Sequence, residues 1–372
     1  TRNIYAGNID TLWVNTPSDG RFDLENPRLK LILDDSLLRW RMYRIEPPLA
    51  PGDSMELKFS TRFEPKGFEN EVTWARIVQN GTFFDNTDVI PIFGYDEGKE
   101  ISSKNRRKHF KLPEKSRRPL LDRNDTINRM EAYIGINSDW VDVETVFRTA
   151  PGQIAIAPGS LIKEWEENGR RCFHYKLDHP SFNFYSFISA DFEVARRDWN
   201  GVSLEVYYHK DHSFNVERML RAIQKSLEYY TENFGPYYHK QCRIIEFPRF
   251  GSFAQAFPGT MPYSEGIGFI QDFKDPDKDI DMVFYVTAHE IGHLYWAHQI
   301  CGWKPSPSGA RSWWWSGNTD ATRCANSSAM KWTGTCAAEA AKRKKNSPWL
   351  PAKGRAIYTT TREACRCTNS RK

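Results

Sequence analysis

The sequence predicts an α+β protein, in which a β-rich region comes first and a helical region with a histidine motif follows. Three observations favour this class. Apolar and polar residues alternate along much of residues 1–210, which is the period of a β-strand. Helical spacing of apolar residues begins near Val216. The segment HEIGH then occupies residues 289–293, directly after an apolar run.

Strands are predicted wherever this alternation continues over several positions. It does so in three stretches, from Met55 to Phe63, from Val141 to Phe147 and from Val202 to Tyr208. Pro-Gly pairs at 51–52 and 151–152 are typical of turns between strands. We therefore interpret residues 1–210 as an N-terminal domain of antiparallel β-sheet.

Residues 211–300 are interpreted as the first part of a second domain. A helix is predicted after Asn215, its expected N-cap, and the pair Gly235-Pro236 is expected to end it. The apolar segment CRIIEFPRF predicts a strand, and the Gly- and Pro-rich segment GSFAQAFPGTMPYSEGIGF predicts a rigid, irregular wall. An acidic turn then leads into a second helix, MVFYVTAHEIGHLYWAH.

The HEIGH segment has the residue types and spacing of a zinc site. His289 and His293 are four residues apart, so on a helix they lie on one face and can bind one Zn²⁺ ion together. Glu290 lies beside them and can act as a general base towards a water molecule. The motif therefore predicts a hydrolytic zinc centre with His289 and His293 as ligands.

A zinc site of this type needs a third protein ligand. His298 is the nearest candidate, but it is nine residues from His289 and therefore about half a turn round the helix. It is expected to point away from the ion and to have a structural role. The chain as written supplies no other third ligand nearby.

Many segments together resemble the membrane-alanyl-aminopeptidase-type gluzincins, and in particular the bacterial branch fused to ABC-type permeases. The resemblance covers roughly residues 35–300 and is carried by HEIGH and by five further segments: PGTMPYSEGIGF, EFPRFGSFAQAF, NGTFFDN, FGYDEGKE and NGRRCFHYKLDHPSFNFYSF. It implies an N-terminal β-saddle domain followed by a thermolysin-like α/β zinc-peptidase domain, here truncated. It also implies removal of N-terminal residues from peptides, and a parent protein anchored in a bacterial membrane and linked to permease segments.

The resemblance assigns further residues by position. In this family a glutamate 24 residues before the first zinc histidine binds the peptide's N-terminal amine, and Glu265 stands there, although the family's usual GxMEN wording is altered to PYSEG. The third zinc ligand is a glutamate about eighteen residues after the second histidine, where this chain has Ser312. A transition-state-stabilising Tyr is also missing, so the chain as written is expected to bind zinc weakly and to hydrolyse peptides poorly.

Composition changes abruptly after residue 300. Residues 301–372 hold 14 of the 52 Lys and Arg residues but only 3 of the 47 Asp and Glu residues. Five of the seven cysteines also lie there. Because the basic surplus belongs to this tail, the net charge of +5 says little about partners of the preceding part. Nucleic-acid binding is therefore not expected.

Codon overlap suggests how the tail arose. When the third base of each codon is read as the first base of the next, Trp303-Lys304 forces Glu and Trp313-Trp314 forces Val. One permitted reading continues as a helical pattern with the missing ligand and a YNKG segment. We therefore interpret residues 301–372 as a frameshift product, poorly structured, which follows a deletion near residues 300–302.

Two other interpretations are compatible with parts of the sequence. The first is a non-catalytic peptide-binding or regulatory ectodomain of a permease; the intact HEIGH argues against it, since such a module has little use for a general base. The second is nucleic-acid binding through the basic stretch 101–118, which we interpret as a solvated loop. No apolar run approaches the roughly 20 residues that a membrane helix needs, so a soluble domain is expected for the chain as given.

Overall fold

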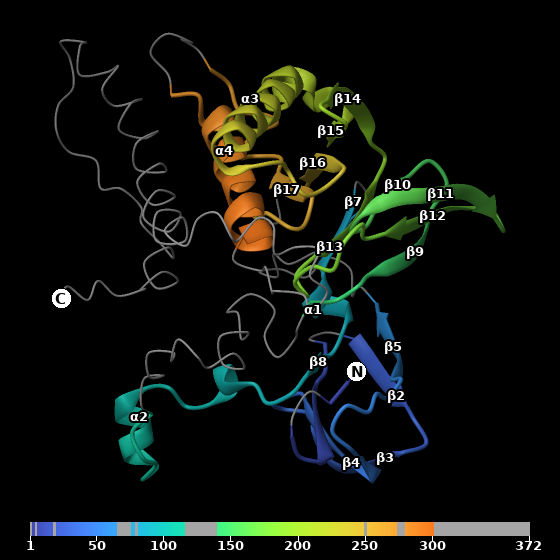
Figure 1. The fold of residues 1–372 in the computed structure, drawn as a ribbon, viewed down its shortest axis with the longest axis vertical. Helices are drawn as coiled ribbons and strands as arrows, with labels where there is room; N and C mark the ends of the chain where they lie inside the picture. Colours follow the sequence, from blue (N-terminus) through green and yellow to red (C-terminus); the bar gives the residue numbers. More distant parts are fainter. Residues whose placement is uncertain are drawn as a thin grey trace. The chain divides into compact units, whose positions relative to one another are not determined.

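The computed structural model describes residues 2–3, 6–17, 20–64, 76–78, 81–115, 140–248, 251–273 and 280–300. Almost all of them belong to one compact unit, Thr1–Lys274 with Asp281–Trp303. The predicted α+β class is confirmed at this level, because the chain is rich in sheet and has few helices (Figure 1). The tail 301–372 lies outside the described residues, so its frameshift origin and poor structure stay predictions.

Two antiparallel sheets form the N-terminal part. One has the strand order β3-β4-β1-β8, and the other pairs β2 with β5. Their strands are β1 (Ile9–Asn15), β2 (Gly20–Glu25), β3 (Leu29–Asp35), β4 (Trp40–Leu49), β5 (Lys58–Phe63) and β8 (Ile92–Phe93). Phe59 and Phe63 of the first alternating stretch lie in β5, whereas Met55 precedes the strand and is buried in the core between the two sheets.

Two further antiparallel sheets follow. One has the order β10-β13-β7-β6 and the other the order β11-β12-β9. Their strands are β6 (Ile77–Val78), β7 (Gly81–Asp85), β9 (Glu144–Thr149), β10 (Ile154–Ile156), β11 (Ser160–Glu167), β12 (Arg170–Lys176) and β13 (Ser186–Ala190). The Pro-Gly pair at 151–152 makes the predicted turn between β9 and β10. Burial alternates along β9, as expected for a strand with one buried face, whereas β13 is buried along almost its whole length.

Among the described residues of this β-rich region, three short helices lie between strands: α1 (Asn86–Val89), η1 (Glu97–Lys99) and α2 (Lys104–His109). The last lies in the basic stretch that we predicted to be a loop, and is a helix with Ser103 as its N-cap. None of its residues is buried, so the prediction of a solvated segment holds although its secondary structure was wrong.

The fifth sheet has the order β14-β15-β16-β17 and is mixed. Its strands are β14 (Glu193–Trp199), β15 (Val202–Tyr208), β16 (Gln241–Phe247) and β17 (Thr260–Ser264). The first pair is antiparallel, whereas β15, β16 and β17 run parallel to one another. Alternation had placed β15 with the N-terminal antiparallel strands. Every residue of β16 and β17 is buried, as is usual for parallel strands covered on both faces.

Two long helices accompany this sheet. The helix α3 (Val216–Phe234) connects β15 to its parallel neighbour β16 and packs beside α4 (Met282–His293), as the yellow-green and orange helices of Figure 1 show. A 3₁₀ segment η3 (Lys210–Asn215) precedes α3, and a π-helical segment η4 (Leu294–Ile300) follows α4. Asn215 is the N-cap of α3 by position, but its side chain donates to the carbonyls of Gly268 and Gln271, at 2.8 Å each.

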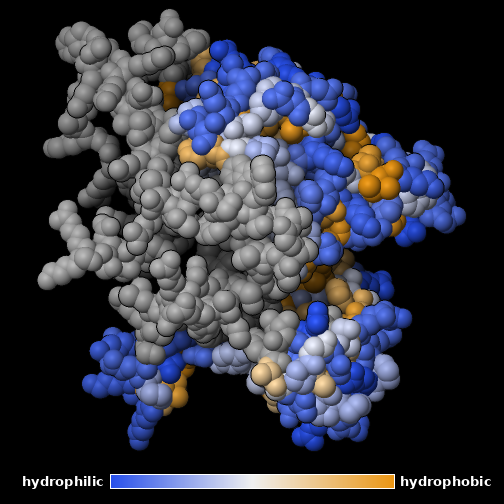
Figure 2. Space-filling view, in the orientation of Figure 1, coloured by the Kyte–Doolittle hydropathy of each residue, from blue (hydrophilic) through white to orange (hydrophobic). Residues whose placement is uncertain are grey.

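Tight packing brings α3 against the HEIGH part of α4. The Tyr230 hydroxyl of α3 donates to the Ala288 carbonyl at 3.4 Å. A Cβ atom at Gly292 would lie 3.1 Å from the same hydroxyl oxygen, so the glycine of HEIGH permits this approach. The surface over α3 is mostly hydrophilic in Figure 2, as expected for a helix that buries only one face.

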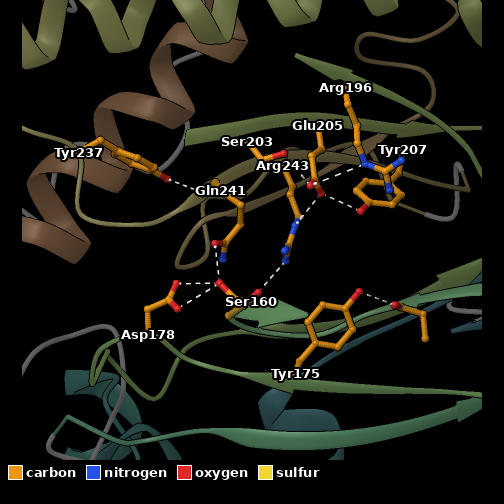
Figure 3. Close-up of polar contacts among 12 residues, drawn as sticks. Ser160, Tyr175, Asp178, Arg196, Ser203, Glu205, Tyr207, Tyr237, Gln241 and Arg243 are labelled. Atoms are coloured by element: carbon orange, nitrogen blue, oxygen red, sulfur yellow. Dashed lines mark hydrogen bonds and ion pairs between the residues drawn. The ribbon is translucent and has the colours of Figure 1, made fainter. Parts of the chain in front are cut away.

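A buried ion pair joins β15 to β16 (Figure 3). Arg243 Nε donates to Glu205 Oε2 at 3.0 Å, and Arg243 Nη1 donates to the Gly159 carbonyl at 2.9 Å. Gly159 has φ +91°, and a Cβ atom there would lie 2.0 Å from the Lys176 carbonyl oxygen. Only glycine fits at this position in the turn before β11. This turn places the Gly159 carbonyl where Arg243 of the mixed sheet can donate to it.

The helices that the structure describes include none with the length and apolarity required to cross a membrane.

Candidate metal centre

The helix that carries HEIGH begins at a well-formed N-cap. The Asp281 carboxylate accepts the backbone N–H of Phe284 at 2.8 Å and pairs with Arg218 of α3 at 2.6 Å. Val283, Thr287 and Ile291 are buried. These contacts fix the start of α4 and its direction, and so position the turn that carries HEIGH.

The two histidines converge as their spacing predicts. His289 Nε2 and His293 Nε2 lie 3.0 Å apart, with the two rings nearly perpendicular. Burial lowers the pKa of both imidazoles, and that of His293 reaches about 4. Both rings are therefore neutral near pH 7, which is the state in which an imidazole nitrogen can bind a metal ion.

Glu290 is buried beside the two histidines, with 6% of its surface exposed. Burial raises the pKa of this carboxyl to about 7, and a hydrogen bond from the Ala256 backbone N–H opposes the rise only in part. A carboxyl whose pKa lies near the working pH can both take and give a proton. This environment is the one that a general base requires.

The donor set fits a metal ion only in part. One ligand atom each from His289, Glu290 and His293 lies within 4.8 Å of the others, and no further His, Cys, Asp or Glu among the described residues joins this group. His289 Nδ1 is buried and has no hydrogen-bond partner among these residues. Metal-binding histidines usually donate this second N–H to a carboxylate or carbonyl. The described residues therefore supply no hydrogen-bond partner of this kind for His289.

His298 has the structural role that the sequence indicates. It lies in η4, is 3% exposed, and its Nε2 donates to the Ala256 carbonyl at 3.0 Å. The backbone of Ala256 therefore contacts both Glu290 and His298. This contact ties the segment before β17 to the end of the HEIGH helix and orients Glu290.

Glu265 follows directly after β17, and its backbone N–H donates to the Phe247 carbonyl at the end of β16. The structure does not group its carboxylate with the three HEIGH residues. It groups Glu265 instead with His212 and Glu246, two residues that sequence reasoning did not single out. Part of the predicted irregular wall is in fact strand β17, which fixes the position of Glu265 at the sheet edge.

Glu290 makes stability depend on pH in the metal-free protein. Its folded-state pKa is raised, so its contribution to stability is fully present below the unfolded value near 4.5 and is lost as pH rises through about 7. Glu290→Gln should remove this loss, because a neutral amide has no charge to bury. We expect the variant to be more stable than the parent by about 3 kcal/mol at pH 8.5.

Urea unfolding in the presence of a chelator, from pH 4.5 to pH 8.5, measures this difference. The gap between parent and variant should open with rising pH. Parallel stability curves would show that the carboxyl is not held in a desolvated site. Glu232→Gln, at an exposed position of α3, provides the matched control and should follow the unsubstituted chain throughout.

No protein-family model and no curated protein sequence matches this chain.

Proposed function

We propose that the chain is a zinc-dependent metallopeptidase domain of the gluzincin type, which removes residues from the N-terminus of peptides. The observation that carries this proposal is the convergence of His289 and His293, with Nε2 atoms 3.0 Å apart, beside a buried Glu290 whose pKa is near neutral. A purely structural helix has no need for a carboxyl that burial holds at this pKa.

Each residue of the candidate metal centre has a separate role in the proposed hydrolysis. His289 and His293 would hold the ion through Nε2, and a bound zinc ion supplies Lewis acidity that makes a water molecule nucleophilic. Glu290 accepts the proton of that water at its carboxylate and later returns it to the leaving amine. Ala256 holds the Glu290 carboxylate in place through its backbone N–H.

Glu265 is proposed to bind the peptide's N-terminal ammonium group. An anion at this position selects a free α-amine and so favours exopeptidase action. The support is its place 24 residues before His289 and its fixed position after β17. We further propose that the β-rich region is the β-saddle of this family and that the mixed sheet with α3 and α4 is the thermolysin-like part.

The chain as written is proposed to be impaired, because it lacks the third ligand and the catalytic Tyr. The parent protein is proposed to be linked to permease segments in a bacterial membrane, on the strength of the resemblance alone.

Peptide binding tests the role of Glu265 without requiring turnover. The chain should bind a short peptide with a free N-terminus more tightly than its N-acetylated form, and Glu265→Gln should remove about tenfold of this preference. A charge-assisted hydrogen bond contributes about 1.5–3 kcal/mol, which is enough for that factor. Fluorescence anisotropy of a peptide labelled at its C-terminus measures both affinities.

The matched control is Asp272→Asn, which removes a nearby exposed carboxylate on the same segment. It should leave the preference unchanged. Equal binding of the free and acetylated peptides by the parent chain would contradict the proposed amine site.

A further inference from the structure

A second group of possible metal ligands lies outside HEIGH. It consists of His212, Glu246 and Glu265, which we call the strand-end cluster. One ligand atom from each residue lies within 4.8 Å of the other two. The three residues come from three different elements: His212 from η3, Glu246 from β16, and Glu265 from the turn that follows β17.

The topology of the mixed sheet explains why they meet. Since β15, β16 and β17 are parallel, their carboxyl ends lie at the same edge of the sheet. η3 leaves the end of β15, and Glu265 is fixed beside the end of β16 by its hydrogen bond to the Phe247 carbonyl. In sheets with parallel strands this edge is the usual place for ligand sites.

Glu246 is the residue that most needs explanation, because its side chain is 0% exposed. Its Oε2 accepts the backbone N–H of His209 at 2.7 Å, and its Oε1 contacts His212 Nδ1. Burial raises the pKa of this carboxyl, and the nearby charge of Glu265 raises it further. The His212 imidazole therefore contacts one carboxylate directly and has a second within reach, and the ring of His209 is a further imidazole beside them, with its centroid 6.0 Å from that of His212.

The donor types select the kind of cation. One imidazole nitrogen with two carboxylate oxygens is a set that suits divalent transition metals such as Zn²⁺ and Mn²⁺. The His212–Glu246 pair alone would satisfy Glu246 without any ligand. Glu265 supplies a second carboxylate and a third possible ligand atom. An ion pair between His212 and Glu246 alone would need neither, whereas a metal ion would use both.

We propose that His212, Glu246 and Glu265 bind a divalent transition-metal cation at a site separate from HEIGH, and that this cation competes with a peptide's ammonium group for Glu265. The first half stands on the geometry of the cluster. The second half rests on the proposed function, because it takes Glu265 to be the amine-binding residue.

A zinc titration of the full chain, after removal of metal by a chelator, tests the site directly. Isothermal titration with Zn²⁺, carried to high zinc concentration, should detect two sites in the unsubstituted chain, of which the HEIGH site is the weaker because it lacks a third ligand. Glu246→Gln should lose one of them, and His293→Ala should lose the other. Asp211→Asn is the matched control, since it removes an exposed charge from the same segment as His212, and it should keep both equivalents.

Retention of both equivalents by Glu246→Gln would overturn the proposal. If circular dichroism shows that this variant does not fold, His212→Asn replaces it, with the same expected loss of one equivalent. Loss of all zinc binding in His293→Ala alone would also overturn the proposal, because the HEIGH site would then account for every ion.

Competition is tested with the labelled free-amine peptide. Saturating Zn²⁺ should weaken its binding to the parent chain at least several-fold relative to Glu246→Gln, which keeps Glu265 but loses the second ion. Unchanged peptide affinity would refute competition. The two proposals can fail separately. If the chain does not prefer the free-amine peptide, the proposed peptidase function is contradicted, but the number of zinc sites is unaffected. If Glu246→Gln still binds both zinc ions, only the strand-end site is contradicted.

Discussion

Arg243→Met is expected to lower the free energy of unfolding by about 3–5 kcal/mol, because it leaves Glu205 buried without its partner. Arg243 is 4% exposed and Glu205 is 8% exposed. Burial alone would raise the pKa of Glu205, but Arg243 and hydrogen bonds from Tyr207 and Ser203 outweigh it and hold that pKa below its usual value. The loss of the guanidinium therefore exposes the full cost of desolvating the carboxylate.

The dependence on pH has a definite sign. Since the folded-state pKa of Glu205 is depressed, its contribution to stability is present above the unfolded value near 4.5 and is lost as pH falls. Urea unfolding at pH 7 and pH 4 measures both effects. The double variant Arg243→Met, Glu205→Leu should recover much of the loss, because no unpaired charge remains. A cost below 1 kcal/mol for the single variant would show that the pair does not hold the sheet together.

The Arg243–Glu205 pair also connects the mixed sheet to the antiparallel sheets that precede it. Through the Gly159 carbonyl, Arg243 connects β16 to the turn before β11 (Figure 3). Phe83 of β7 stacks on Phe247 of β16, with ring centroids 5.0 Å apart. We therefore expect a single cooperative unfolding transition for these sheets.

The sequence predicts the candidate site best where the residues lie on a single helix. The four-residue spacing of His289 and His293 fixes their common face, so the convergence of their Nε2 atoms could be predicted from the chain alone. The raised pKa of Glu290 could not, because it depends on burial and on the backbone of Ala256, which is distant in sequence.

Strand pairing was predicted less well, since alternation shows that a segment is a strand but not which strand lies beside it. The antiparallel pairing predicted for β15 is present with β14, but alternation does not show that its other neighbour is β16, which pairs with it in parallel across the α3 connection. The strand-end cluster was missed for the same reason. A charged residue inside the apolar run CRIIEF was the one signal for Glu246, and nothing local connects it to His212.

The largest effect that we expect is on peptide hydrolysis, when Glu290 is replaced by glutamine. Glu290→Gln should lower kcat by about 10²–10⁴-fold, the usual contribution of a general base, while leaving zinc bound, because the amide keeps the shape of the site but cannot accept a proton. The experiment requires a complete metal centre. It therefore uses a frame-corrected chain, in which the codons after residue 300 are read in the proposed alternative frame. The nucleotide sequence across residues 295–310 shows where that frame begins.

Hydrolysis of an aminoacyl anilide by this frame-corrected chain, loaded with zinc and compared with its Glu290→Gln variant, tests the central claim most directly. The proposed function predicts turnover by the frame-corrected chain, little turnover by the chain as written, and loss of activity with retained zinc in the variant. A folded, zinc-loaded, frame-corrected chain that does not hydrolyse the anilide, or that hydrolyses it equally well with Gln at residue 290, would contradict it.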